Sequence, residues 1–281
     1  MKLRIATCRP LPEPDPDEDL LLDALAAAGV QARMAAWNDP AEAWTDPIPT
    51  VIRSTWDYIH DADGFLEWVR RVNRTAPLWN GPRAVAANVH KRYLVELEAR
   101  GIPVIPTALV TRDDTDDVAG IRTARGWGDI VIKPAVGAAS HGTRCFVADE
   151  RDEAERHLAA LIRRGDALIQ PYVGSVDGHG ERALVWIDGA FTHAVRKSPR
   201  FSDGEEDVSD AVPIAPDELV LGQHVLATIA DDLLYARVDV ARDDMGRPLV
   251  MEVELIEPSL FLLQSPPALE RLVQGMVRRL T

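Results

Sequence analysis

Two segments near the C-terminal end constrain the fold of this chain most, because both alternate with the two-residue period of a β-strand. They are residues 235–240 and 249–255, and the turn sequence Asp243-Asp244-Met245-Gly246 lies between them. Their valine, leucine and methionine positions form an almost unbroken apolar run, which is typical of strands in the interior of a protein. The pattern therefore predicts two neighbouring strands in the centre of a sheet.

These two strands also carry charged side chains. Side chains two positions apart share one face of a strand, so Arg237 and Asp239 share a face, as do Glu252 and Glu254 on the neighbouring strand. Three carboxylates on one sheet face cannot all stay ionised without a cation. Carboxylate oxygens suit hard metals, so Asp239, Glu252 and Glu254 are predicted to bind Mg²⁺ or Mn²⁺ together with phosphate oxygens. The alternative is a solvated sheet face balanced by Arg237.

Composition narrows the class of protein. A chain of 281 residues can form one large domain or two to three small ones. No apolar run approaches the ~18 to 20 residues of a membrane span, and the N-terminus does not resemble a secretory signal, so we expect a cytoplasmic protein without a membrane partner. The net charge of −14 argues against nucleic acid as a partner. Cys8 and Cys145 lack metal-site spacing, and we expect both to be buried as small apolar residues.

The N-terminal part reads as a βαβ unit, which usually belongs to a parallel sheet. We expect a strand over 3–7, a helix over 19–28 and a strand over 30–34. The loop over 8–14 contains no glycine, which disfavours a dinucleotide-binding Rossmann dehydrogenase.

A fourth element carries the first candidate substrate residues. The expected strand 50–54 includes Arg53 and leads into Trp56, Asp57 and Tyr58, ahead of an expected helix over 64–73. Open α/β sheets bind ligands at the carboxyl ends of their strands, so this cluster is a candidate binding site. The alternative is that Trp56 and Tyr58 only pack under the helix.

Lysine is scarce in this chain, with four lysines against twenty-seven arginines. Lys91 lies on an expected helix over 85–100, and Lys133 ends an expected strand over 130–134. The loop 135–143 follows that strand, and its glycines and small residues can donate backbone N–H groups to phosphates. It lacks the Gly-Lys-Ser/Thr of a Walker A loop. The alternative is an ordinary hairpin, which does not explain the lysine at the strand end.

We also expect strands over 106–110 and 167–170 and a helix over 118–125. The strand 167–170 runs into a proline, which frees backbone groups to contact a ligand edge such as adenine. Residues 181–197 predict a hairpin with Asp188-Gly189 at the turn, and it ends in Arg196 and Lys197. Residues 198–218 are acidic and predict a mobile surface loop.

In order and spacing, these segments resemble the ATP-grasp carboxylate-amine ligases with a glutathione-synthetase-like ATP-binding region. The segments that carry the resemblance are Lys91, Lys133-Pro134, 137–142, 170–173, Gly180-Glu181, 237–239 and 252–254. The stretches 53–58, 193–197 and 252–260 look like small bacterial enzymes of peptide and antibiotic assembly. Those enzymes include amino-acid (dipeptide) ligases and the D-cycloserine synthetase that cyclises O-ureido-D-serine.

The resemblance implies an α/β ATP-grasp fold of three units, with ATP between the last two. These are an N-terminal parallel βαβ domain (1–86), a central lid domain (87–172) and a C-terminal mixed-sheet domain (173–281). It also implies residue roles. ATP would be held by Lys91, Lys133, Gly137, Ser140, His141, Gly142, Gln170, Tyr172, Val173 and Glu181. Asp239, Glu252 and Glu254 would bind Mg²⁺, with Arg237, Lys197 and Arg196 at the reacting groups and Arg53, Trp56, Asp57, Tyr58, Glu257 and Ser259 at the amino-acid substrate.

Two positions depart from the family pattern. Glu254 stands where the family usually has asparagine, and the acidic segment 202–210 replaces a substrate loop that contains glycine and arginine. The resemblance implies an acylphosphate mechanism that forms a C–N bond and releases ADP and phosphate, with amino acids as small-molecule substrates. The alternatives are an intramolecular cyclo-ligase and a catalytically silent nucleotide-binding regulatory protein. A homodimer is left open.

Overall fold

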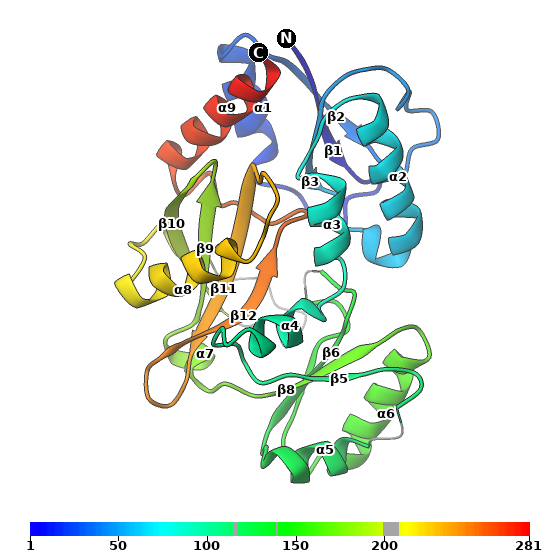
Figure 1. Ribbon diagram of the computed structural model, residues 1–281, viewed down its shortest axis with the longest axis vertical. Helices are drawn as coiled ribbons and strands as arrows, with labels where there is room; N and C mark the ends of the chain where they lie inside the picture. The colour runs from blue at the N-terminus through cyan, green and yellow to red at the C-terminus, as the bar shows by residue number, and fades with distance from the viewer. Residues whose placement is uncertain (115–116, 139, 199–207) are drawn as a thin grey trace.

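The structure is a computed structural model that describes residues 1–114, 117–138, 140–198 and 208–281. The described residues form three four-stranded sheets, shown in Figure 1. Their strand orders are β2-β1-β3-β4, β5-β8-β6-β7 and β10-β9-β11-β12. Each sheet is built from one continuous third of the chain, which agrees with the predicted α/β class.

The N-terminal sheet is parallel, as the βαβ pattern predicts. Its strands are β1 (Lys2–Thr7), β2 (Gln31–Ala36), β3 (Thr50–Ser54) and β4 (Leu78–Trp79). Its helices are α1 (Glu18–Ala27), the 3₁₀ helix η1 (Tyr58–His60), α2 (Ala62–Thr75) and α3 (Pro82–Asn88). Helix α2 begins where the Asp61 carboxylate accepts the Gly64 amide at 3.0 Å, and it buries Phe65, Trp68 and Val69 against the sheet.

The central sheet is antiparallel, and this part of the chain also contains three helices. Its elements are α4 (Tyr93–Ala99), β5 (Ala108–Val110), α5 (Val118–Arg125), β6 (Ile130–Pro134), β7 (Arg144–Phe146), α6 (Arg151–Ile162) and β8 (Ala167–Pro171). Helix α5 matches its predicted bounds because both ends are capped. Asp117 accepts the Gly120 amide at its start, and Gly126 ends it with a φ of 67°.

The predicted helix over 85–100 is wrong in its middle, because α3 ends at Asn88 and α4 begins only at Tyr93. Lys91 therefore lies in a turn and not on a helix. Tertiary hydrogen bonds explain the break, since the Lys91 amide donates to the Ala135 carbonyl at 2.7 Å, outside any helix. The Asn88 side chain bonds the backbone of the C-terminal sheet instead of facing water.

The C-terminal sheet holds the two segments that constrain the fold most. Its elements are α7 (Ser175–Gly178), β9 (Glu181–Ile187), β10 (Ala190–Lys197), α8 (Pro216–Ala227), β11 (Tyr235–Arg242), β12 (Pro248–Glu254) and α9 (Pro266–Leu280). Strands β9 and β10 form the predicted hairpin, and β11 lies between β9 and β12. We expected a mixed sheet, but its four strands are antiparallel. A parallel bridge joins Val104 to Val250 on its edge.

The C-terminal end of the predicted loop over 198–218 forms regular structure, which its acidic composition does not indicate. Most of the acidic segment 202–210 lies outside the described residues. Val208 and Val212 form bridges with Lys197 and Ala194 on β10, and residues 216–218 already belong to α8. The described end of the segment therefore runs along the edge of the C-terminal sheet.

The N-terminal and C-terminal sheets share one hydrophobic core. Helix α1 lies beside α9 in Figure 1, and Leu25, Leu272 and Met276 belong to this core. The buried Asn80 side chain donates to the carbonyls of Tyr235 and Leu255 and accepts the Leu234 amide, all at 2.7–2.8 Å. These contacts fix the N-terminal sheet against the ends of β11 and β12.

The two cysteines differ in their exposure. Cys8 is buried, as predicted, whereas Cys145 is partly exposed on the edge strand β7. Among the described residues, none of the helices combines the length and the apolar composition needed to cross a membrane.

Candidate functional site

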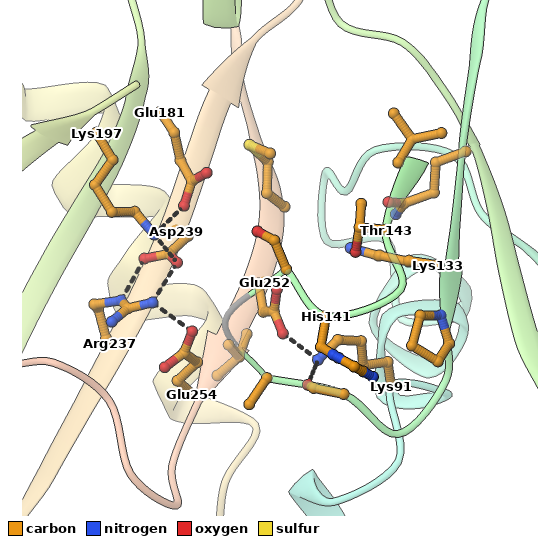
Figure 2. A pocket seen from close by; sticks show the side chains of 18 of the residues that line it. Lys91, Lys133, His141, Thr143, Glu181, Lys197, Arg237, Asp239, Glu252 and Glu254 are labelled. Atoms are coloured by element: carbon orange, nitrogen blue, oxygen red, sulfur yellow. Dashed lines mark hydrogen bonds and ion pairs between the residues drawn. The ribbon is translucent and has the colours of Figure 1, made fainter. Parts of the chain in front are cut away.

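The described residues enclose a cavity of about 1520 Å³, counting the part open to solvent, where the three sheets approach one another. Most of the predicted site residues line it. They are Trp56, Tyr58, Lys91, Lys133, Gly137, Ser140, His141, Gln170, Tyr172, Val173, Glu181, Lys197, Arg237, Asp239, Glu252, Glu254, Glu257 and Ser259. Residues far apart in the sequence are thus brought to one place, as Figure 2 shows for ten of the lining residues.

Four predicted site residues do not line the cavity. Arg53 lies behind it and donates to the Pro258 carbonyl at 2.9 Å. Asp57 accepts from the Trp37 indole at 2.6 Å, and Gly142 lies behind the loop, where His157 bonds its carbonyl at 2.9 Å. Arg196 points away because neighbouring residues on β10 alternate between its two faces.

Arg237 binds two carboxylates on the cavity face of the C-terminal sheet. The register of β11 and β12 pairs Arg237 with Glu254 and Asp239 with Glu252. The Arg237 guanidinium donates to both oxygens of Asp239, at 2.8 and 2.9 Å, and also contacts Glu254. Burial, together with repulsion from Asp239 and Glu252, raises the pKa of Glu254 to about 7 despite this contact.

Lys197 extends the same ion-pair network to β9. Its ammonium lies 3.0 Å from Asp239 and 2.5 Å from Glu181. Burial is the largest cause that raises the pKa of Glu181 to about 7, and the neighbouring charge of Asp239 adds to it. Figure 2 shows Glu181, Lys197, Asp239, Arg237 and Glu254 as one connected series along the sheet.

The two other lysines of the cavity differ in their partners. Lys91 pairs with Glu252, and its ammonium donates to the Gly137 carbonyl at 2.7 Å. Lys133 is 8% exposed and has neither a hydrogen bond nor an ion pair with any described residue. Burial lowers the pKa of Lys133, and the nearby charge of Lys91 lowers it further, while Glu252 opposes the shift. A buried ammonium without a partner is suited to an incoming anion such as a phosphate.

The expected metal ligands are not gathered into a preformed metal site. The described residues contain no group of three or more histidine, cysteine, aspartate or glutamate side chains placed to hold a metal. Asp239, Glu252 and Glu254 each face a protein cation instead. Their oxygens still match the donors that Mg²⁺ prefers, on strand positions that face one another. Asp239 is 1% exposed, which argues against the solvated alternative at this position, whereas the side chains of Glu252 and Glu254 are 25% and 28% exposed. The balancing cations include Lys91 and Lys197 as well as Arg237.

The predicted nucleotide-binding residues of β6, β8 and the loop after β6 form one wall of the cavity. A Cβ added to Gly137 would lie 2.9 Å from Pro134, so the loop passes too close to β6 for another residue. The Gln170 amide donates to Thr107 at 2.8 Å, and the Tyr172 hydroxyl donates to Asp177 at 2.5 Å. The backbone N–H of Tyr172 donates to Asp129, so it is not free for a ligand, contrary to our expectation.

The opposite wall contains the turn that follows β12. Three consecutive carbonyls of this turn each accept a hydrogen bond from a buried or half-buried side chain. Tyr235 donates to Ile256 at 2.8 Å, Trp56 to Glu257 at 3.2 Å and Arg53 to Pro258 at 2.9 Å. Arg237 also donates to the carbonyl of Ser259, at 3.2 Å. The turn is thereby fixed with Glu257 and Ser259 at the cavity.

Sequence reasoning did not single out several other lining residues. Among them are Glu13, Asn88, Tyr93 and Met251. Glu13 lies in the proline-rich loop after β1, where no local pattern distinguishes it from the other acidic residues. Asn88 and Tyr93 flank Lys91 at the helix break, so an accurate prediction of that break would have drawn attention to both.

Comparison with known proteins connects this geometry to a family. Residues 3–80 match the family model of the D-cycloserine synthetase DcsG N-terminal domain. The chain is 33% identical over 283 residues to the cycloserine biosynthesis protein DcsG of Streptomyces lavendulae, with 95% of this chain and 94% of that protein covered.

Solved structures agree with this similarity. The crystal structure of D-cycloserine synthetase DcsG superposes with a TM-score of 0.91 at 30% identity, over 100% of both chains. The ATP-grasp ligase PsnB, in a complex with a precursor variant, Mg and ADP, shares the fold with a TM-score of 0.66 at 20% identity, over 99% of this chain and 98% of that chain. The chain therefore belongs to the DcsG family, and it is an ATP-dependent C–N bond-forming ligase with the ATP-grasp fold.

Proposed function

We propose that this enzyme activates the carboxylate of a small amino-acid substrate with ATP and closes it onto a nitrogen of the same molecule. The similarity to D-cycloserine synthetase over nearly the whole chain favours this cyclising reaction over the joining of two amino acids. The observation that carries the proposal is the cavity itself. It places Lys133, a buried lysine with no ion-pair partner among the described residues, opposite an arginine and three carboxylates.

We place the nucleotide against the central sheet. Lys133 and Lys91 would contact the phosphates, and the loop with Gly137, Ser140, His141 and Gly142 would lie over them. Gln170, Tyr172 and Val173 would line the adenine and Glu181 the ribose. Because the Tyr172 amide is already bonded, hydrogen bonding to the adenine edge falls to the backbone of Val173.

Asp239, Glu252 and Glu254 would hold Mg²⁺, which neutralises negative charge on bound phosphates when present. Around it, the protein side chains have separate tasks. Arg237 and Lys197 are held by buried carboxylates, so their positions are set before substrate arrives. Arg196 faces the other side of β10, so its part in the reaction stays a prediction. Arg53 and Asp57 act through the residues that they hold in place.

The proposed reaction has two steps, a phosphoryl transfer followed by an acyl transfer. A carboxylate oxygen of the substrate attacks the γ-phosphorus, the bond from that phosphorus to the bridging oxygen breaks, and ADP leaves. The substrate nitrogen then attacks the acyl carbon, loses a proton and expels inorganic phosphate. Positioning and charge neutralisation supply most of the rate in chemistry of this kind.

The test is purified protein with ATP and Mg²⁺, offered O-ureido-serine, single amino acids and pairs of amino acids, with products identified by mass spectrometry. ADP release with a cyclic product from one substrate supports the proposal. A dipeptide mass that requires two amino acids would establish the amino-acid ligase alternative. Nucleotide binding without ADP release under any condition would favour the regulatory alternative, and undiminished turnover in EDTA would contradict the metal assignment.

We also propose the wider setting. The three units 1–86, 87–172 and 173–281 act as domains around the cavity, and the enzyme works in the cytoplasm on free small molecules. A homodimer stays a prediction, which the molecular mass in solution tests.

A further inference from the structure

We propose that Glu257 recognises the amino group of the substrate and so determines which carboxylic acids this enzyme accepts. This inference rests on the proposed function and names the group that the site selects. Glu257 lines the cavity on the wall formed by the turn after β12, beside Trp56 and Tyr58 of the N-terminal domain.

The Glu257 carboxyl group is buried without a partner. The residue is 7% exposed, and its side chain has no hydrogen bond or ion pair with any described residue. Every other acidic side chain on the C-terminal sheet face of the cavity is paired, Glu252 with Lys91 and both Asp239 and Glu254 with Arg237. A buried carboxyl without a partner is costly, and such groups are retained where a ligand supplies the missing hydrogen bonds.

Hydrogen bonds fix the backbone around Glu257, so its side chain is preorganised to bind a ligand. Its carbonyl accepts from the Trp56 indole, and the carbonyls on either side accept from Tyr235 and Arg53. Leu262 and Leu263 follow Glu257 by five and six residues, and their amides donate to the buried Asp17 carboxylate at 3.1 Å. A group held in this way binds without a large ordering cost.

The surrounding charges favour an amino group over a carboxylate at this position. Burial raises the pKa of Glu257 above its usual range, and the charge of Glu254 adds to the shift, which Lys91 and Arg237 oppose. A substrate carboxylate here would add a further negative charge beside two acidic side chains and would be repelled by either of them in its ionised form. An ammonium group would pair with Glu257 and draw it into the ionised state. The substrate carboxylate then lies toward Arg237 and Lys197, where the proposed phosphoryl transfer takes place.

The test compares Glu257→Gln and Glu257→Leu with wild type and with the control Glu270→Gln, which is on the exposed face of α9. We expect the KM for O-ureido-serine to rise about 10-fold in E257Q and about 100-fold in E257L, while the KM for ATP stays within twofold. The analogue with a hydroxyl in place of the α-amino group supplies a second measure. Wild type should reject it, and E257L should accept both compounds equally poorly. The control should match wild type in every measurement.

The outcomes separate the two levels of the proposal. If wild type turns over no amino-acid substrate, the proposed function fails and the subsite with it. If wild type is active and E257L keeps both its KM and its preference for the amine, the proposed function stands and the assignment of Glu257 is wrong. Should E257L fail to fold, the KM and the amine preference of E257Q decide the question, because glutamine keeps the size and polarity of the side chain.

Discussion

At the scale of single residues, Lys91 and Lys133 show how similar side chains acquire different tasks. Both are nearly buried in the same cavity, but Lys91 is paired with Glu252 and Lys133 has no such partner among the described residues. Lys91 therefore stabilises the empty site, whereas Lys133 is a cost to the folded protein until an anion binds. Their substitutions should separate stability from activity.

Lys133→Met should lower kcat/KM by about 100- to 1000-fold, the usual effect of losing one charge that stabilises a transition state, while leaving the melting temperature unchanged or higher. Lys91→Met should lower both activity and melting temperature, because it leaves the partly buried Glu252 without its ion-pair partner. Rates of ADP release and calorimetric melting curves measure the two effects. Wild-type ADP release in K133M, or a large loss of stability there, would contradict this assignment.

The charge of Glu254 should make stability depend on pH. Its pKa in the folded protein is about 7, above the ordinary value of 4.5, so the folded protein holds an extra proton between these values. Stability from this group is therefore present at low pH and is lost as pH rises toward 7. Glu254→Gln should melt roughly 2 to 4 °C above wild type at pH 8, and this difference should vanish near pH 5. Equal melting differences at both pH values would argue against the shifted pKa.

The alternating pattern of β11 and β12 made the acidic face predictable, because strand geometry places residues two apart on one side. The partners of those carboxylates were not predictable to the same extent. Lys91, in a turn, pairs with Glu252, and Lys197, on β10, pairs with Asp239. These contacts join distant parts of the chain, so no local sequence pattern predicts them.

At the scale of elements, side chains at the break between α3 and α4 make hydrogen bonds to the backbone groups at the outer edge of β12. Asn88 donates to the Val253 carbonyl and accepts the Leu255 amide, both at 2.8 Å, and the Tyr93 hydroxyl accepts the Val253 amide at 3.2 Å. The helix break at 89–92 and this edge therefore depend on each other. A helix prediction based on periodicity cannot include such bonds, which is why the continuous helix over 85–100 was wrong.

Asn88→Ala should lower the stability of the protein by about 1 to 3 kcal/mol, because it leaves a backbone carbonyl and a backbone amide without partners. Tyr93→Phe removes one longer hydrogen bond, and its effect should be smaller. Urea unfolding curves of both variants give the comparison. A variant N88A as stable as wild type would show that water replaces both bonds.

At the scale of the whole molecule, the N-terminal part of the chain contributes few residues that line the cavity, but its side chains hold the turn after β12 in place. Asp17, which precedes α1, is 3% exposed and bonds two amides beyond β12, across 245 positions of sequence. Arg53 and Trp56 hold the same turn from β3 and the loop after it. The parallel βαβ arrangement was predictable from the sequence, but its docking against the C-terminal sheet was not, because that contact joins residues with no shared local pattern.

Asp17→Ala should loosen the turn that carries Glu257. We expect a lower melting temperature, since two amides lose their acceptor, and a higher KM for the amino-acid substrate with little change in the KM for ATP. Hydrogen exchange of residues 256–263 should become faster in this variant. Unchanged exchange together with an unchanged KM would mean that the turn holds its shape without Asp17.

The charges that line the cavity have a consequence for the energetics of nucleotide binding. Six carboxyl groups face four lysine and arginine side chains there, so the fully ionised cavity carries an excess of two negative charges. Part of that excess is relieved by bound protons, since the pKa values of Glu181 and Glu254 are both about 7. If the carboxylates bind Mg²⁺ as proposed, the divalent cation that enters with the nucleotide would take over this neutralisation and release the protons to the solvent. The heat of binding should then vary with the ionisation enthalpy of the buffer, because bound protons are exchanged for a metal cation.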